Sequence, residues 1–397
     1  MLYARRIVCD RCIYGVDINP LAVEMAKLSL WLVTMAKGRA FTFLDHALKC
    51  GDSLLGLWDV EQIHKFHLDT SVPVQAGLWG DHLRAIFERA MAKRRELESF
   101  SVIDVRDAEA KARLLAEADR AMEVVRVLCD LLIAGAISTA DGNSQRRGKM
   151  LPDAFDQFRN RIFDRLMEAS SRQEIESAVE AVRALIPEGQ ALLNAVNPNS
   201  ENPRRPFHWT LEYPEIFSAA PSSLRTNVPR TGFSAFVGNP PFQGGQKITG
   251  VLGTDFRNYC IDAHARGQRG SADLCAYFFL RAGQLLEPNG TFGLLATNTI
   301  AQGDTREVGL EQLVKGGFSI LRGIASRKWP GTANLEVAHV WMHKGPWQAP
   351  APSTTNPSPP SPRSSSSPAR SPANPTASPP TPVNHSSGHT SSGWGSS

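Results

Sequence analysis

Residues 233–242 read Phe233-Ser-Ala-Phe-Val-Gly-Asn-Pro-Pro-Phe242. The apolar run Phe233–Val237 predicts a short buried strand. Two consecutive prolines cannot continue a central strand, so the chain must turn after Gly238 with a fixed shape. This turn presents the Asn239 side chain, a proline carbonyl and the Phe242 ring at the carboxyl end of a strand. In an open α/β sheet ligands bind at such a place; a plain structural turn is the alternative.

A strand–turn–helix unit is predicted near the start of the chain. Ile13–Asp17 is a candidate strand with an acid at its tip, Asn19 suits a helix cap, and Pro20 suits the first helical position. The acid, Asp17, is placed to accept hydrogen bonds from ribose hydroxyls, or it is a capping or surface acid. Apolar residues at helical spacing predict that the helix continues to about Lys37: Leu21, Met25, Leu28, Leu32 and Met35.

A second strand is predicted at Leu44–Cys50, followed by Gly51-Asp52-Ser-Leu54. The Asp52 carboxylate at this strand tip could accept a hydrogen bond from the amino group of an adenine ring. Gly-Asp-Ser is also common turn chemistry, which is the alternative interpretation.

Composition shifts divide the chain into four segments. Residues 1–58 form the first part of a sheet domain, and residues 59–206 carry apolar stripes at helical spacing that predict an all-α insertion. Residues 207–347 return to strands and helices. Residues 348–397 are dominated by Pro, Ser, Thr and Ala, which predicts a disordered tail, either a native linker or the product of a shifted reading frame.

The second sheet segment supplies three more predicted strands and two helices. The strands are Thr291–Thr297, Phe318–Ile324 and Leu335–Met342. The short connection Lys328–Gly331 suits a hairpin, so the last strand should be antiparallel. The helices are expected from a Ser271 cap to Leu286 and from Asp304 to Lys315, with a turn at Pro288-Asn-Gly290.

The Gly-rich segment Gln243–Thr254 follows the proline turn. It does not fit the Gly-x4-Gly-Lys-Ser/Thr phosphate loop. We expect it to approach a ligand closely or to act as a mobile lid. Lys247 in this segment and Pro241 of the turn are the candidate substrate-binding residues.

The cysteine content, the hydropathy and the net charge exclude few classes of function. Six scattered cysteines suit reduced thiols, and Cys9 and Cys12 are expected to be ordinary buried or half-buried thiols rather than metal ligands. No metal site is predicted. No apolar run is long enough to span a membrane, so a cytoplasmic location without a membrane partner is expected. The net charge of +4 permits a nucleic-acid partner without requiring one.

Taken together, these motifs resemble those of the N6-adenine DNA methyltransferases. Asn239-Pro-Pro-Phe242 is similar to the fourth family motif, Val16-Asp17-Ile-Asn-Pro20 to the second and Gly51–Leu54 to the third. The segments Gly244–Gly250 and Gln268–Leu274 resemble the large single-chain methylases of restriction–modification and phage-defence systems. The resemblance runs from about Ile7 to Trp347. It implies a Rossmann-like class I methyltransferase sheet that lacks its first strand, with an all-α insertion.

The resemblance also implies an activity. The family transfers a methyl group from S-adenosylmethionine to the N6 atom of adenine in DNA. Asn239 and Pro240 would accept hydrogen bonds from the adenine amino group, and Phe242 would stack on the flipped base. Asp17 would hold the cofactor ribose and Asp52 the cofactor adenine.

One departure from the family pattern concerns the methyl donor. The Gly-rich first motif precedes the Asp17 strand in the family, but Met1–Arg11 contains no glycine. We therefore expect a chain truncated at both ends, with weak or absent cofactor binding alone. Another chain could supply the Gly-rich motif and the target-recognition domain. The alternatives are a methyltransferase for protein glutamine or ribosomal-RNA adenine, and a non-catalytic remnant or DNA-binding subunit.

Overall fold

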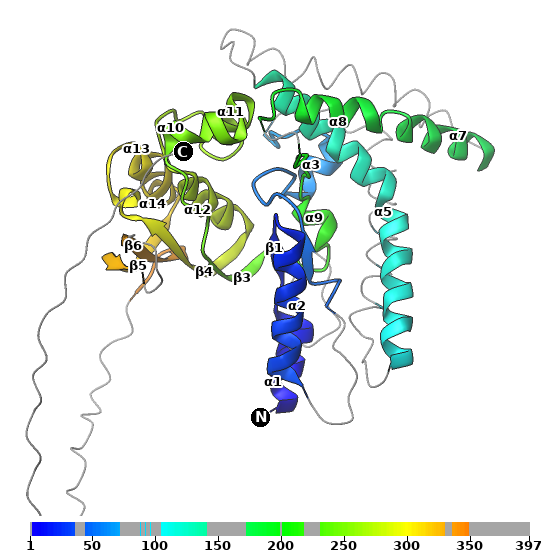
Figure 1. Ribbon diagram of the computed structural model, residues 1–397, viewed down its shortest axis with the longest axis horizontal. Coiled ribbons are helices and arrows are strands. Elements are labelled where there is room, and N and C mark those ends of the chain that lie inside the picture. The colour runs from blue at the N-terminus through cyan, green and yellow to red at the C-terminus, as the bar shows by residue number, and fades with distance from the viewer. Residues whose placement is uncertain are drawn as a thin grey trace, which may run out of the picture. The chain divides into compact units, whose positions relative to one another are not determined.

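The computed structural model of the chain is a mixed α/β structure with two separate sheets (Figure 1). Helices and strands alternate at the start of the chain, and runs of helices separate most of the later strands. The structure describes residues 2–35, 44–71, 105–140, 172–198, 201–217, 231–329 and 336–348, together with the single helical positions 88, 92 and 96.

The first sheet contains two short parallel strands. Strand β1 (Gly15–Asp17) pairs with β2 (Leu48–Cys50), and the helices α1 (Leu2–Cys12) and α2 (Pro20–Thr34) accompany them. The Asn19 side chain accepts a hydrogen bond from the Leu21 backbone N–H at 2.9 Å. This confirms the predicted cap and the position of Pro20 in the first turn. The predicted end of the helix near Lys37 lies outside the described residues.

The second sheet has four strands in the order β3-β4-β6-β5. Strands β3 (Phe233–Gly238) and β4 (Leu286–Thr297) are parallel. Strand β6 (Glu336–Lys344) lies between β4 and β5 (Phe318–Lys328) and is antiparallel to both. The predicted antiparallel last strand is therefore confirmed.

Strand β4 begins earlier than the sequence predicts. The predicted turn at Pro288-Asn-Gly290 lies inside β4 as an irregularity. Asn289 adopts a φ of 64°, and the pairing with β3 jumps from Leu286 to Thr291. Turn-forming residues thus interrupt the strand pairing without ending the strand.

Between residues 59 and 206 the described elements are all helical. They are α3 (Val60–Lys65), α5 (Val105–Thr139), α7 (Arg172–Arg183) and α8 (Ile186–Asn194). Val125 and Ile133 of α5 belong to the same buried core as Phe279 and Phe292. These helices therefore share one core with the second sheet. The predicted domain boundaries remain predictions, and the tail from Ala349 lies outside the described residues.

The Gly-rich segment after the proline turn is largely helical. Its expected close approach to a ligand, or its role as a mobile lid, stays a prediction. The segment forms α10 (Gly245–Leu252) and α11 (Thr254–Ala263), separated by Gly253 at a φ of 97°. The next helix, α12 (Leu274–Leu285), is capped by Asp273 rather than by Ser271, because the Asp273 carboxylate accepts the Cys275 backbone N–H at 3.1 Å.

The predicted helix from Asp304 to Lys315 is present in three joined pieces. These are α13 (Gly303–Arg306), the π-helical turn η2 (Glu307–Glu311) and α14 (Gln312–Lys315). A short 3-10 helix, η1 (Asn298–Ala301), connects them to β4.

Strand β3 is only partly buried, which differs from the prediction: Phe233 and Phe236 are half-buried, whereas Ala235 is exposed and Val237 is 92% exposed. The periodic apolar residues of α2 are exposed. They are Leu21 at 65%, Met25 at 60%, Leu28 at 50%, Leu32 at 55% and, just beyond the helix, Met35 at 54%. Periodicity correctly indicates the helix, but no described residues cover its apolar stripe.

A half-buried carboxylate joins the first sheet to the helices. Glu212, at the end of α9 (Trp209–Glu212), contacts Lys49 of β2 at 2.5 Å and Arg126 of α5 at 2.8 Å. Burial alone would raise the pKa of Glu212, but the two cations outweigh it and lower the pKa to about 2. The carboxylate is therefore ionised at all ordinary pH values.

Among the described residues, no helix combines the length and the apolar character that a membrane span needs. The same residues contain no group of three or more His, Cys, Asp or Glu side chains that could hold a metal ion. All six cysteines are free thiols; Cys9 is buried, whereas Cys12 is exposed rather than half-buried as expected.

Candidate functional site

The proline turn follows β3, which is an edge strand of the second sheet. Strand β3 ends at Gly238, and the following residues alternate in burial. Asn239 is exposed, Pro240 is buried, Pro241 is exposed and Phe242 is half-buried. The Asn239 amide is thus available to a ligand, while Pro240 anchors the turn in the protein.

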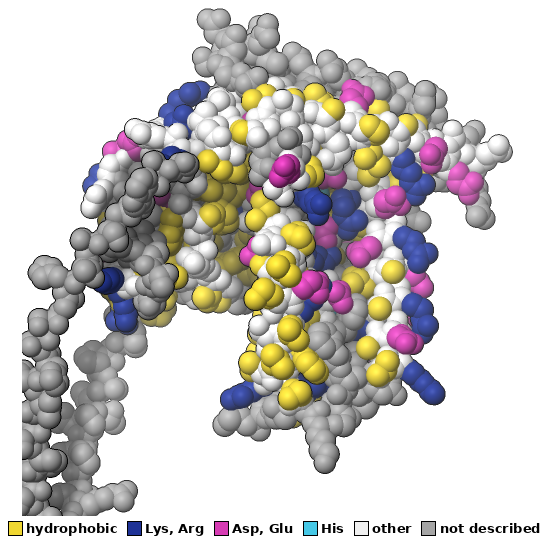
Figure 2. All heavy atoms as spheres, in the orientation of Figure 1, with side chains coloured by type: hydrophobic (Ala, Val, Ile, Leu, Met, Phe, Trp, Pro, Cys, Tyr) yellow, Lys and Arg dark blue, Asp and Glu magenta, His cyan; other side chains and the backbone are white. Residues whose placement is uncertain are grey.

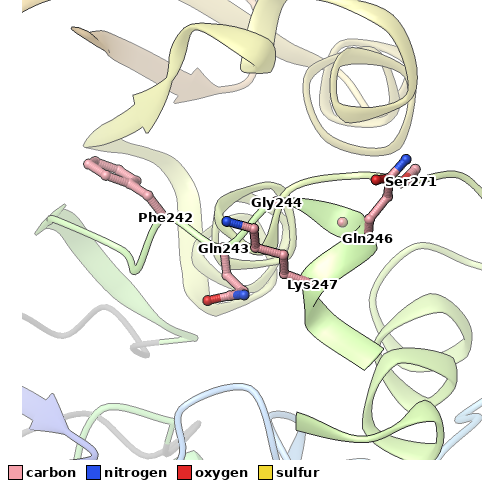
Figure 3. Close-up of a pocket in the computed structure, with 7 residues that line it drawn as sticks. Phe242, Gln243, Gly244, Gln246, Lys247 and Ser271 are labelled. Carbon is pink, nitrogen blue, oxygen red and sulfur yellow. The ribbon is translucent and has the colours of Figure 1, made fainter. Parts of the chain in front are cut away.

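A cavity of about 440 Å³ lies directly after this turn. Figure 3 shows the Gln243 and Lys247 side chains near one another, with the Phe242 ring to one side and Gln246 beside Ser271 to the other. The lining therefore combines an aromatic face with amide, hydroxyl and ammonium groups. The residues that line it are Phe242, Gln243, Gly244, Gly245, Gln246, Lys247 and Ser271.

The start of α10 is held tightly against the segment before α12. The Leu274 backbone N–H donates to the Gln243 carbonyl at 2.9 Å. A Cβ atom at Gly245 would lie 2.3 Å from the Ser271 carbonyl oxygen, so only glycine fits there. This close packing fixes the cavity wall and explains one glycine of the Gly-rich segment.

Asp273 ties the cavity wall to the end of β4. Its Oδ1 caps α12, and its Oδ2 accepts from the Thr297 hydroxyl at 3.3 Å. Its backbone N–H donates to Thr305 Oγ1 at 3.1 Å. The neighbouring Ser271 N–H donates to the Asp304 carboxylate. The cavity is therefore supported by the carboxyl end of a strand and by two helix termini.

The two predicted cofactor-binding acids lie on the first sheet. Asp17 is exposed at the tip of β1, and its Oδ1 accepts from the Asn19 N–H at 2.8 Å. Asp52 follows β2, and its Oδ1 accepts from the Leu54 and Leu55 N–H groups at 2.9 and 3.3 Å. Burial raises the pKa of Asp52, and these two hydrogen bonds oppose the rise. Neither acid lines the cavity beside Phe242.

A buried arginine supports the loop that carries Asp52. Arg281 is 2% exposed and donates to the Leu54 and Gly56 carbonyls at 2.8 and 3.1 Å. Its guanidinium lies 4.5 Å from the centre of the Trp58 ring. Burial lowers the pKa of Arg281 to about 10, so it stays charged at neutral pH. This charge also opposes the rise in the pKa of Asp52.

The structure therefore brings Phe242 and Lys247 to one cavity, while Asn239, Pro240 and Pro241 form the turn that leads into it. Sequence reasoning did not identify Gln243, Gln246 and Ser271 as lining residues. Only their positions in the sequence could have indicated these residues. Gln243 and Gln246 lie inside the Gly-rich segment, and Ser271 was predicted only as a helix cap.

Comparison with known proteins identifies the family. Residues 11–315 match the profile described as "Eco57I restriction-modification methylase". A putative type II restriction enzyme and methyltransferase of Methanocaldococcus jannaschii is 21% identical over 248 residues. That match covers 58% of this chain and 18% of the relative.

Among solved structures, the type IIL restriction–modification enzyme MmeI in complex with DNA is similar over 28% of this chain and 15% of its own, with 20% identity and a TM-score of 0.22. The family match itself spans more than half of the sequence and includes β1, the proline turn and the cavity. The chain therefore belongs to the Eco57I restriction-modification methylase family.

Proposed function

We propose that the chain is an adenine-specific DNA methyltransferase domain, which methylates N6 and uses S-adenosylmethionine. The observation that carries this proposal is the exposed Asn239 in an Asn-Pro-Pro-Phe turn that leads into a cavity lined by Phe242. An aromatic face beside a cavity suits a base that has left the duplex, since every base has a π-face to stack.

Asn239 and Pro240 would act on the exocyclic nitrogen of that base. The adenine amino group is a poor nucleophile because its lone pair is delocalised into the ring. Hydrogen bonds from it to the Asn239 side-chain oxygen and the Pro240 carbonyl favour a more tetrahedral nitrogen with an available lone pair. The turn would also position the adenine nitrogen against the methyl group, and such positioning can supply a large part of a rate enhancement.

S-adenosylmethionine would supply an electrophilic methyl group when bound. The exposed Asp17 carboxylate at the tip of β1 fits ribose hydroxyls, which are hydrogen-bond donors. Asp52 fits less fully, because its Oδ1 already accepts two backbone N–H groups. We assign Asp17 to the ribose and Asp52 to the adenine amino group of the cofactor.

Lys247 and Pro241 are proposed as DNA contacts. Lys247 is exposed at the cavity, so its ammonium can approach a phosphate next to the flipped base. Pro241 is the exposed proline of the turn and offers an apolar surface to the base or its sugar.

The strand arrangement supports a Rossmann-like class I sheet. We propose that β2-β1 and β3-β4-β6-β5 are the two halves of one such sheet, interrupted at the position of its first strand. In that arrangement Asp17 and Asn239 follow the carboxyl ends of their strands, where ligands of open α/β sheets bind.

A direct test measures transfer of labelled methyl from S-adenosylmethionine to unmethylated DNA, RNA and protein. The proposal expects label in DNA, at N6 of adenine, and loss of at least about 100-fold in Asn239→Ala. Label in RNA or protein instead of DNA, or full activity of Asn239→Ala, contradicts it.

Base flipping can be tested without the methyl donor. DNA that carries 2-aminopurine at candidate target positions should become brighter when the chain binds, because the base leaves the stack. Phe242→Ala should change this signal, since the stacking face is lost. Phe278→Ala is a matched control, because Phe278 is half-buried on α12 and does not line the cavity. An identical signal from Phe242→Ala and the parent chain contradicts the assigned role of Phe242.

A further inference from the structure

An exposed basic loop follows helix α11. It consists of residues 265–270, Ala-Arg-Gly-Gln-Arg-Gly, and contains no acidic residue. The side chains of Arg266 and Arg269 are both exposed. Within the described ranges of the chain, neither side chain takes part in an ion pair or a hydrogen bond. The basic loop therefore presents two guanidinium groups that are free to bind a ligand.

The backbone of the basic loop is fixed, although its arginine side chains are not. The Gly267 N–H donates to the Ile261 carbonyl at 2.9 Å. The Ala265 carbonyl accepts from the Gln268 N–H at 2.8 Å and from the Gln312 side-chain amide at 3.0 Å. A ligand that binds the two arginines therefore does not have to order the backbone that carries them, which lowers the entropic cost of binding.

The basic loop is joined directly to the wall of the candidate cavity. Ser271, which lines the cavity, follows Gly270 in the chain. Arg257 of α11 donates to the Gly270 carbonyl at 3.0 Å, and the Ser271 N–H donates to the Asp304 carboxylate. Lys247 adds an exposed ammonium group to the same cavity. Positive charge thus continues from the cavity lining onto the loop, and Figure 2 shows Lys and Arg side chains on the surface near α10.

Its place beside the cavity distinguishes this loop from other exposed cations. Arg327 and Lys328 are exposed at the end of β5, and Lys315 ends α14 with the Glu311 carboxylate 3.6 Å away. None of these three cations lines the cavity or lies next to a residue that does. A ligand that occupies the cavity can therefore reach Arg266 and Arg269 along a continuous stretch of chain.

The backbone conformation of Arg266 is unfavourable for an arginine. Its φ is 51°, in the left-handed region, and Gly267 follows at a φ of 80°. Side chains with a Cβ atom disfavour this region, and glycine or asparagine is the common residue where a helix ends in it. Glycine would serve the fold at least as well at this position. A ligand for the guanidinium group gives the arginine side chain a purpose that the fold does not.

We propose that Arg266 and Arg269 form a phosphate clamp for the DNA strand that carries the flipped base. This inference rests on DNA as the substrate in the proposed function. Guanidinium groups bind phosphate oxygens through paired N–H donors. The clamp would hold the phosphates beside the extruded nucleotide, with Lys247 on a phosphate at the cavity itself. Contacts of this kind fix the position of a strand, while the turn from Asn239 to Phe242 contacts the base.

The test measures how the full chain binds fluorescent duplex DNA of mixed sequence at increasing salt, without a methyl donor. Each lost phosphate contact reduces the slope of log K against log salt by about 0.9. Arg266→Gln and Arg269→Gln should each reduce the slope by this amount, equally for unrelated sequences, because phosphate contacts carry no sequence information. Arg327→Gln is the matched control, because Arg327 is exposed on β5 and should leave the slope unchanged.

Arg266→Gly separates DNA binding from folding. This variant should lose as much DNA binding as Arg266→Gln, whereas its melting temperature should not fall, because glycine adopts a positive φ without steric cost. A fall in melting temperature with unchanged DNA binding would show that Arg266 serves the fold and would contradict the clamp.

Three outcomes overturn the clamp as a whole. They are a parent chain that does not bind DNA, unchanged slopes in both Gln variants, and a loss of poly-glutamate binding without a loss of DNA binding, which would assign the arginines to an acidic protein. The proposed reaction is tested separately. A chain that binds DNA with the expected slopes but transfers no methyl group supports the clamp and contradicts only the reaction.

Discussion

At the scale of single residues, Glu212 carries the clearest pH-dependent contribution to stability. Its pKa of about 2 lies below the ordinary value of 4.5, because Lys49 and Arg126 hold the charged form. A lowered pKa contributes stability that is fully present above the unfolded pKa and is lost as the pH falls toward 2. The shift corresponds to roughly 3 kcal/mol at neutral pH, as an order of magnitude.

We therefore expect Glu212→Gln to lower the free energy of unfolding by about 2–4 kcal/mol at pH 7. The difference from the parent chain should shrink as the pH is lowered from 4.5 toward 2. Urea unfolding at pH 7, 4 and 3 measures both effects. Glu307→Gln is the control, since Glu307 is exposed and should change stability by less than about 0.5 kcal/mol. A difference that does not depend on pH would show that the charge of Glu212 is not the cause.

At the scale of elements, helix α10 depends on one glycine and tolerates change at another. A Cβ atom at Gly245 would lie 2.3 Å from the Ser271 carbonyl, whereas Gly250 has no heavy atom within 4 Å of its ideal Cβ position. Gly245→Ala should destabilise the protein by about 1–3 kcal/mol through overpacking. Gly250→Ala should stabilise it by about 0.5–1 kcal/mol, because alanine is the better helix former.

Thermal unfolding of the two variants tests whether their effects on stability have opposite signs. The melting temperature should fall for Gly245→Ala and rise for Gly250→Ala. If both variants shift it in the same direction, the tight contact between α10 and Ser271 does not determine the stability of this region.

Many of the helices and strands were predictable from the sequence, but the burial of these elements was not. Alternation of apolar runs and caps located β1, α2, β3 and the antiparallel last strand. Helices α10 and α11 were missed because five glycines lie between residues 244 and 267 and outweigh the helical pattern. The burial of β3 was wrongly predicted, since burial depends on which other segments cover a strand and not on the strand's own residues.

The candidate site shows the same limit. The turn from Asn239 to Phe242 was visible in the sequence because two prolines and an aromatic ring stand together. The contribution of Ser271 was not visible, because it reaches the cavity only through contacts with Gly245, which lies 26 positions earlier in the chain. Local sequence chemistry thus indicated the turn at the centre of the candidate site, and tertiary packing added the other lining residues.

At the scale of the whole molecule, we expect weak binding of S-adenosylmethionine to this chain alone. The contacts assigned to it are the carboxylates of Asp17 and Asp52, and hydrogen bonds to charged groups contribute about 1.5–3 kcal/mol each. Two such bonds fall short of the roughly 8 kcal/mol that a micromolar dissociation constant requires. Isothermal titration calorimetry measures this, with Asp17→Ala as the comparison. Micromolar or tighter binding would contradict the expectation.

The position of β6 has a consequence for synthesis on the ribosome. β6 follows β5 in the sequence but lies between β4 and β5 in the sheet. β5 emerges first, and the end of β6 at Lys344 follows the end of β5 at Lys328 by 16 residues, which takes roughly 1–3 s. During that interval β5 is present and can pair with β4 in place of β6. Nascent chains therefore pass through a window in which mispairing competes with the native sheet, and slower translation of residues 329–344 would lengthen it.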